Sequence, residues 1–183
     1  SNGNEREQAN YCYVPSTWAE NIVEQAEKDG LRLSYHTPYR LNIHRDEFCK
    51  LAWQTIQTVN PNINLPELTK PFSACDEDIV RQIAALGIVT GYEDGTFQPT
   101  RELSRQEAAV ILQRLYTVLY GKIEASPTLY ADNGSIGVWA KDSVYAMRQT
   151  GIMQGVGANR FDPKNGYTCE QSIITMLRMT QKA

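Results

Sequence analysis

Apolar residues along this chain fall into three stretches with the spacing of an amphipathic helix. The middle stretch shows the i, i+3, i+4, i+7 pattern most clearly, which is typical of a helix with one buried face. The three apolar stripes are Phe48, Leu51, Ala52 and Ile56; Ala108, Ile111, Leu112, Leu115 and Leu119; and Ile173, Met176, Leu177 and Met179. We therefore predict three helices, which begin near Arg45, Arg105 and Cys169.

Each of these helices is preceded by a shorter segment that also reads as a helix. The earlier segments cover residues 18–29, 76–86 and 139–150. Directly after them stand Gly30, Gly87 and Gly151, at the position where a helix commonly ends on a left-handed residue. The chain is thus expected to contain three helix-loop-helix units.

The three units are copies of one another. The second and third copies align without gaps at an offset of 64 residues (151 minus 87). Pairs at this offset are Gly87 and Gly151, Gly91 and Gly155, Phe97 and Phe161, Pro99 and Pro163, Ser104 and Thr168, Glu107 and Gln171, and Arg114 and Arg178. The first copy matches the second at an offset of 60 in its second helix (105 minus 45) and 57 at its glycine (87 minus 30). Its loop is therefore three residues shorter (60 minus 57).

One unit of about 50 residues buries too little surface to be stable alone, so the copies should share a core. We predict a mainly α fold in which three units form one pseudo-threefold, pseudo-trimeric helical domain. Unit one spans residues 11–60, unit two 70–121 and unit three 128–181, after a polar leader at residues 1–10. The leader has no hydrophobic signal core, which fits either a cytosolic chain or a piece of a longer secreted protein.

Charge and composition narrow the choice of partners. The formal net charge is -3 among 183 residues, and basic residues form no stripe. Nucleic acid and anionic membranes are poor candidates for that reason. No apolar run approaches the roughly 20 residues that span a bilayer, so membrane insertion is not expected. The chain has two histidines and no Cys-x-x-Cys pair, so we expect neither a metal nor a cofactor.

Polar residues at the start of each second helix are the first candidates for chemistry. Ser104 with Glu107, and Thr168 with Gln171, fit the capping box, in which a hydroxyl and an acid or amide satisfy free backbone groups. A capping box does not require Arg45 or Arg105, because a cation in the first helical turn opposes the helix dipole. These two arginines either bend away into water or form an anion site together with the free N–H groups of the helix start. Cys169 replaces the arginine in unit three.

Glycine and tryptophan residues mark the rest of the candidate site. Gly91, Gly95 and Gly155 lie in the loops, where they permit turns or close approach of a ligand to the backbone. Trp18 and Trp139 precede the first helices of units one and three, and they either pack in the core or stack on a sugar ring between neighbouring units. Phe97 and Phe161 in the loops are expected to fill the core.

Taken together, these motifs resemble the S-layer homology family over roughly residues 11–179. The shared features are Trp-Ala before the first helix, Gly-Ile at its end, Gly-x-Phe-x-Pro in the loop, and a Thr-Arg-Ala-Glu-like tetrapeptide that opens the second helix. This tetrapeptide reads His44-Arg45-Asp46-Glu47, Ser104-Arg105-Gln106-Glu107 and Thr168-Cys169-Glu170-Gln171. The stretch Tyr130-Ala131-Asp132 is typical of the start of such a unit.

The resemblance implies a three-pronged anchor that binds secondary cell-wall polysaccharide, often with pyruvate ketals, in grooves between units. It implies that Arg45 and Arg105 meet the acidic sugar and that Ser104, Glu107, Glu47, Asp132 and Thr168 belong to the binding region. The implied location is extracellular, at the cell wall or S-layer. The chain would be a monomeric module of a larger exported protein.

The cysteines are interpreted through the same resemblance, because an exported protein meets an oxidising environment. We predict a Cys49–Cys75 disulfide and a second one between Cys12 and Cys169. The alternative is free, buried thiols. Cys169 at a helix start is also a candidate for a lowered pKa and a reactive thiolate.

The function predicted from sequence is therefore a non-catalytic cell-surface anchor for an acidic wall polysaccharide. One alternative is an interaction or structural module that has lost sugar binding, which Cys169 and the degenerate unit one favour. A second alternative is an enzyme, which lacks a plausible nucleophile–base pair or metal set in this sequence.

Overall fold

The computed structural model describes residues 10–182, and this part of the chain is mainly α-helical, as predicted. Its helices are α2 (Glu20–Lys28), α3 (Arg45–Val59), α4 (Asp78–Ala85), α5 (Arg105–Tyr120), α6 (Lys141–Gln149) and α7 (Cys169–Thr180), with short 3-10 turns η1 (Asn133–Ser135) and η2 (Val138–Ala140). Isolated β-bridges occur within residues 10–182, but no strand does. The predicted leader at residues 1–10 lies almost entirely outside the described residues.

Local sequence signals place the helix ends well. The second helices begin at Arg45, Arg105 and Cys169, where the apolar stripes predicted them. The first helices are each a few residues shorter than predicted, because their opening residues form a turn in unit one, irregular backbone in unit two and the 3-10 turn η2 in unit three. Gly30, Gly87 and Gly151 take positive φ angles of 93°, 76° and 73°, which confirms their predicted role just past the first helices.

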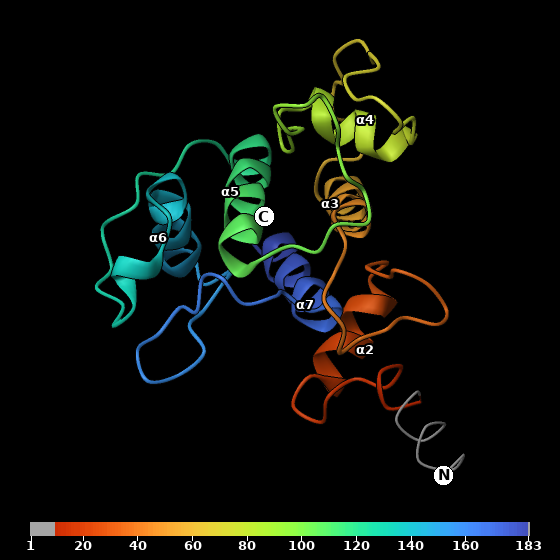
Figure 1. Ribbon diagram of the computed structural model, residues 1–183. Coiled ribbons are helices and arrows are strands. Elements are labelled where there is room, and N and C mark those ends of the chain that lie inside the picture. Colours follow the sequence, from red (N-terminus) through yellow and green to blue (C-terminus); the bar gives the residue numbers. More distant parts are fainter. Residues whose placement is uncertain (1–9, 183) are drawn as a thin grey trace.

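The helices of the three units interlock in a closed ring. The first helix of each unit packs against the second helix of the preceding one: α4 on α3, α6 on α5 and α2 on α7. Figure 1 shows the long helices α3, α5 and α7 in the middle, with α4, α6 and α2 on the outside. Since α2 of unit one closes on α7 of unit three, no unit is complete without its neighbour. This ring is consistent with the predicted pseudo-threefold arrangement.

Backbone hydrogen bonds form a second closed ring, near the starts of the long helices. The N–H of Ile43 donates to the carbonyl of Tyr167 at 2.8 Å, and the N–H of Tyr167 donates to Leu103 at 3.0 Å. The N–H of Leu103 donates back to Ile43 at 3.2 Å. One residue from each unit thus donates to the preceding unit of the ring, so these bonds hold the N-terminal ends of α3, α5 and α7 together.

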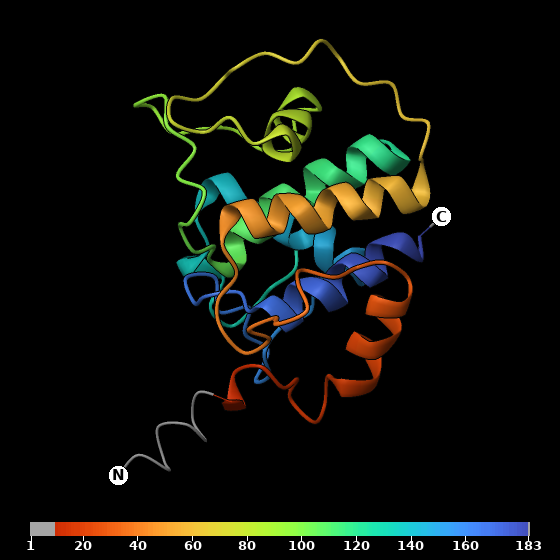
Figure 2. The same cartoon turned by 90° about the vertical axis from the view of Figure 1, so that its right-hand side faces the viewer.

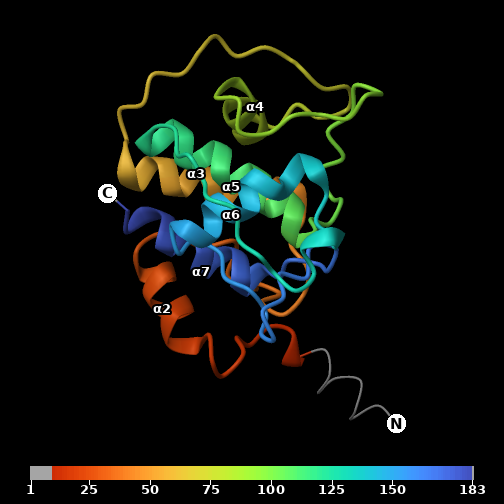
Figure 3. The same ribbon diagram turned by 90° about the vertical axis from the view of Figure 1, so that its left-hand side faces the viewer.

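A shared apolar core joins the units. Phe97 and Phe161 are fully buried, which confirms that the loop phenylalanines fill the core, and Phe48 of α3 is equally enclosed. The linker at residues 60–70 runs along the outside of α4 (Figures 2 and 3). None of the described helices is both long and apolar enough to cross a membrane.

Candidate functional site

Arg105 and Arg45 are buried side chains that join consecutive units. Arg105 of unit two donates from Nε to the carbonyl of Phe161 and from Nη2 to that of Gln154, both at 2.8 Å. Arg45 of unit one makes the same pair of bonds to unit two, through the carbonyls of Phe97 at 3.0 Å and Thr90 at 2.8 Å. The two arginines are 4% and 7% exposed, so neither bends away into water as one alternative assumed.

These arginines also keep capacity for a ligand. A guanidinium carries five N–H donors, and the two carbonyls take only two of them. Burial lowers the pKa of Arg105 below its ordinary value, since desolvation disfavours the charged form. Within residues 10–182, no carboxylate forms an ion pair with either guanidinium. An uncompensated buried cation is a binding group for an anion.

Arg105 forms part of the wall of a groove that we name groove A, with a cavity volume of about 420 Å³. It collects residues from all three units: Trp18 of unit one, Arg105 of unit two, and the loop and α7 of unit three. The lining residues are Trp18, Arg105, Gln154, Gly155, Val156, Tyr167, Gln171, Ile174, Thr175 and Arg178.

Arg45 contributes to an equivalent groove B, whose cavity volume is about 190 Å³. Its lining residues are Arg45, Val89, Thr90, Glu107, Val110, Ile111, Arg114 and Trp139. Arg114, Glu107 and Thr90 stand 64 residues before Arg178, Gln171 and Gln154 of groove A, so the internal repeat recurs in space. The two grooves are two copies of one site.

The charges of the grooves differ at one position. Groove A holds Arg105, Arg178 and the neutral Gln171, whereas groove B holds Arg45, Arg114 and the carboxylate of Glu107. Two like charges lie close together in groove B, on Arg45 and Arg114. Burial lowers the pKa of Arg114, and the positive charge of Arg45 lowers it further. Groove A therefore carries one more net positive charge than groove B.

Trp18 and Trp139 lie at the groove walls. Each is 62% exposed, so the core-packing alternative for these residues is wrong. Trp18 shares groove A with Arg105 of unit two, and Trp139 shares groove B with Arg45 of unit one. The sequence places Trp18 and Arg45 in the same unit, but the interlocked fold separates them into different grooves.

The third junction between units, junction C, has lost the features of a groove. Cys169 stands where grooves A and B have arginine, Cys75 where groove B has Trp139, and Gln54 where groove B has Arg114. Lys50 of α3 donates to the carbonyl of Leu33, the counterpart of Thr90 and Gln154. Gln54 bonds the backbone of Arg32 twice, at 2.8 Å and 3.0 Å. Side chains of α3 thus latch this junction to the loop of their own unit.

Replacing Lys50 with methionine tests this latch. The variant should lower the free energy of unfolding by about 1 kcal/mol, because the Leu33 carbonyl loses its donor. Urea unfolding followed by circular dichroism measures the change. Lys164→Met, at an exposed position, is the control and should stay within about 0.5 kcal/mol of the wild type. A Lys50→Met protein as stable as the wild type would show that the latch contributes nothing.

The predicted capping boxes at α5 and α7 are confirmed. The hydroxyl of Ser104 accepts from the N–H of Glu107 at 3.3 Å, and the Glu107 carboxylate accepts from the N–H of Ser104 at 3.1 Å. Thr168 and Gln171 make the same exchange at 3.2 Å and 3.0 Å. The N-cap residues Ser104 and Thr168 line neither groove. Their capping-box partners do, Glu107 in groove B and Gln171 in groove A.

Asp132 and Glu47 serve local structure outside both grooves. The Asp132 carboxylate accepts from the N–H groups of Phe161 at 2.9 Å and Asp162 at 2.8 Å. Burial alone would raise the pKa of Asp132, but these two donors and Arg160 outweigh burial and lower it. Glu47 accepts from the N–H of His44 at 3.0 Å, at the half-buried start of α3. The side-chain atoms of His44, Asp46 and Glu47 that could bind a metal ion lie within 4.8 Å of one another. The hydrogen bonds at the start of α3 account for this cluster without a metal.

Two of the three predicted loop glycines serve close packing. A Cβ on Gly91 would lie 2.7 Å from the Phe72 ring, and one on Gly155 would lie 2.6 Å from the carbonyl oxygen of Arg160. Gly155 also lines groove A. Gly95 has a φ of 81° and open space around it, so it serves the turn rather than either groove.

Neither predicted disulfide is present, because Cys49, Cys75 and Cys169 are free thiols. All three are buried, which favours the neutral thiol packed as a small apolar side chain. Burial raises the pKa of Cys169 to about 12, with a further rise from Glu47. The hypothesis of a reactive thiolate at Cys169 is therefore wrong, since desolvation exceeds any effect of the helix start.

Arg114 and Arg178 are the groove residues that the sequence interpretation missed. They were recognised only as a matching pair at the offset of 64. The signal that could have found them is a cation kept on the second helix in two units, at the position where unit one has Gln54. Finding them required knowing that this helix face borders the neighbouring unit.

The fold defines a helical repeat module with two related grooves between its units. The S-layer homology domain family matches residues 73–109 and 134–166, which span the loops of units two and three. The chain therefore contains S-layer homology repeats.

Curated relatives share these repeats. The chain is 33% identical over 100 residues to an S-layer protein of Bacillus thuringiensis subsp. finitimus, which covers 55% of this chain and 12% of that protein. It is 32% identical over 100 residues to the S-layer protein sap of Bacillus anthracis, with the same two shares of 55% and 12%. It is 33% identical over 88 residues to an endoglucanase of Bacillus sp. (strain KSM-635), covering 47% of this chain and 9% of that enzyme. The chain thus spans only a small part of each relative. S-layer homology repeats in such proteins imply attachment to the cell wall.

Proposed function

We propose that this chain is a non-catalytic module that anchors a larger protein at the cell surface by binding an acidic, pyruvylated wall polysaccharide. The observation that carries the proposal is the duplication of one site. Grooves A and B each place an exposed tryptophan beside two arginines, at the junction of different units. The match to the S-layer homology family and the similarity to S-layer proteins support a location at the cell surface.

The chemistry of both grooves suits an acidic sugar. The indole of Trp18 or Trp139 offers a flat apolar face for the C–H groups of a sugar ring. A carboxylate on the sugar accepts hydrogen bonds from the guanidinium groups, which are stronger than neutral hydrogen bonds. In groove A, Arg105 and Arg178 supply these groups from two different units. A pyruvyl ketal combines a ring and a carboxylate in one ligand.

The two grooves should differ in affinity, and junction C should not bind. Groove A has the neutral Gln171 where groove B has Glu107, so an anion meets less repulsion in groove A. Groove A is also the larger, at about 420 Å³ against about 190 Å³. Junction C lacks both the tryptophan and the arginines. We expect calorimetric titration with a monovalent acidic sugar to give two sites of unequal affinity per chain.

Co-sedimentation with purified cell walls tests the proposal. The protein should pellet with walls that carry the polysaccharide, and binding should fall when the pyruvyl groups are removed by mild acid. Raising the salt concentration should weaken binding, because partly exposed charge contacts are screened. Equal pelleting with pyruvylated and depyruvylated walls would rule out carboxylate recognition.

One observation favours a purely structural or interaction role as the second candidate. Arg45 and Arg105 each bond two carbonyls of the next unit, so their presence is explained without a ligand. Under that alternative, the protein binds no wall polymer at all, with or without pyruvyl groups. Binding of a partner protein by a chain that does not pellet with walls would favour it.

A further inference from the structure

A further cavity lies beside groove A, and its lining residues all belong to unit three. Its volume is about 600 Å³, and it lies between α6 and the loop at residues 154–160. Gln154 and Gly155 line both this cavity and groove A, so one short backbone segment separates the two spaces. We name this space the α6 cavity.

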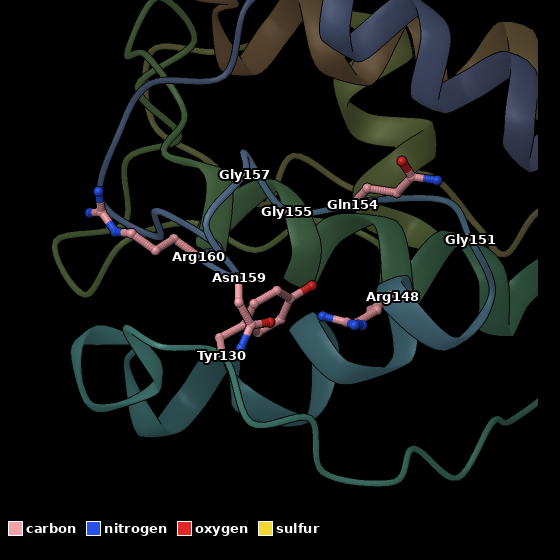
Figure 4. A pocket seen from close by; sticks show the side chains of 8 residues that line it. All are labelled: Tyr130, Arg148, Gly151, Gln154, Gly155, Gly157, Asn159 and Arg160. Atoms are coloured by element: carbon pink, nitrogen blue, oxygen red, sulfur yellow. The ribbon is translucent and has the colours of Figure 1, made fainter.

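Two side chains give the α6 cavity its chemistry, and Figure 4 shows them beside each other. Arg148 comes from α6, and its guanidinium carbon lies 4.8 Å from the centre of the Tyr130 ring. Arg148 is exposed, and its guanidinium makes neither a hydrogen bond nor an ion pair with any side chain or carbonyl of residues 10–182. Lys182 adds a second cation near the Gly151 rim, 4.0 Å from where a Cβ on that glycine would lie. The cavity is therefore positively charged and holds no neutralising carboxylate.

The Tyr130 hydroxyl has no hydrogen-bond partner among the described residues, although Tyr130 is only 4% exposed. A buried hydroxyl without a partner costs folding free energy, so an apolar ring would be the more stable choice. Tyr130 lines the α6 cavity, where a ligand or a water held by that ligand can supply the missing partner.

At the matching positions, unit two has the same packing without the hydroxyl and without the guanidinium. Ser73 donates to the carbonyl of Gly95 just as Ala131 donates to that of Asn159, which makes Phe72 the counterpart of Tyr130. Both rings pack on the loop phenylalanine of their unit, with ring centres 5.1 Å and 5.6 Å apart. Arg148 corresponds to Ala84 at the offset of 64 (148 minus 84). Packing is thus satisfied by phenylalanine and alanine in unit two, and unit three adds a hydroxyl and a guanidinium.

We propose that the α6 cavity is a second subsite that binds a further acidic residue of the glycan held in groove A. The inference rests on the proposed function, because the ligand reaches the cavity as the continuation of that glycan past Gln154 and Gly155. Arg148 receives the acidic substituent, and the Tyr130 hydroxyl completes its hydrogen bonds. Groove B has no such extension, so long glycans bind preferentially at groove A.

Affinity as a function of glycan length tests this subsite. The probes are a fragment of the wall polysaccharide with one pyruvylated residue and a longer fragment of several repeats. Arg148→Ala should weaken binding of the longer fragment about tenfold and leave the short fragment unchanged, since only the long one reaches the cavity. Tyr130→Phe should weaken binding of the long fragment several-fold without lowering the thermal unfolding midpoint, because Phe72 fills the same position in unit two.

Lys164→Ala is the matched control, because it also removes one positive charge from unit three. Lys164 is exposed and lines neither the α6 cavity nor groove A. This variant should bind both fragments like the wild type. Equal affinities of Arg148→Ala and wild type for the long fragment would overturn the subsite while leaving groove A intact. A wild-type protein that binds neither fragment would overturn the proposed function, and the subsite with it.

Discussion

Replacing Arg105 with alanine should lower the free energy of unfolding by about 3 kcal/mol, since two hydrogen bonds from a charged donor are lost. The two acceptors, the carbonyls of Phe161 and Gln154, belong to unit three, whereas Arg105 belongs to unit two. The loss therefore loosens the contact between two units. Chemical unfolding followed by circular dichroism gives the change directly.

This structural role limits the use of Arg105→Ala as a test of wall binding. The structure buries the side chain and gives it two structural acceptors, so a loss of binding by this variant cannot be assigned to the ligand alone. Arg178→Gln is the cleaner binding variant, because Arg178 lines the same groove and makes one long hydrogen bond, of 3.4 Å, to Ile152. Unchanged stability in Arg105→Ala would contradict the structural role.

Arg160→Ala serves as the stability control for Arg105→Ala. Its closest carboxylates, on Asp132 and Asp162, are both 3.9 Å away, and the side chain is 54% exposed. Exposed ion pairs of this kind contribute less than about 1 kcal/mol, so the control should unfold close to the wild type.

Features fixed by neighbours in the sequence could be predicted here. The helix starts at Arg105 and Cys169 follow from the capping residues directly before them, and Gly87 and Gly151 follow from the left-handed end of a helix. These signals act over a few residues, so one sequence is enough to find them. The internal repeat then extended the prediction from one unit to all three.

Features fixed by another unit could not be predicted in the same way. The acceptors of Arg105 lie 49 and 56 residues away in the sequence, and both are backbone carbonyls, which any residue type supplies. No pattern of side chains records such a contact. Cys169 was a weak sequence signal that junction C differs from the two grooves. The donor that replaces the arginine there, Lys50, bonds Leu33 within unit one, and neither of the other units has a lysine at the matching position.

Grouping of the groove residues depended on the same interlocking. In the sequence, Trp18 and Arg45 both belong to unit one, which favours grouping them in one site. Because α2 packs on α7, Trp18 reaches groove A, and because α6 packs on α5, Trp139 reaches groove B. Each groove is thus composite, and removing one unit would damage both.

Replacing both Trp18 and Trp139 with alanine should have the largest effect on binding of any change that preserves the fold. Each single variant should weaken binding of a short acidic fragment at its own groove about tenfold, a typical effect for a central aromatic contact. Both indoles are 62% exposed, so neither replacement opens a core cavity and the unfolding midpoint should not change. Calorimetric titration resolves the two sites, and only the site that carries the replaced residue should weaken.

The double variant tests whether the two grooves bind one wall polymer together or each bind it independently. If one wall polymer engages both grooves, co-sedimentation should fall by far more than either single variant shows, because the second contact is intramolecular. Tyr35→Ala is the matched control, since Tyr35 is 99% exposed and lines neither groove. Pelleting of the double variant at the wild-type level would exclude both tryptophans from binding and favour the structural role. A loss confined to the Trp18 variant would instead identify groove A, with its extra positive charge, as the principal attachment site.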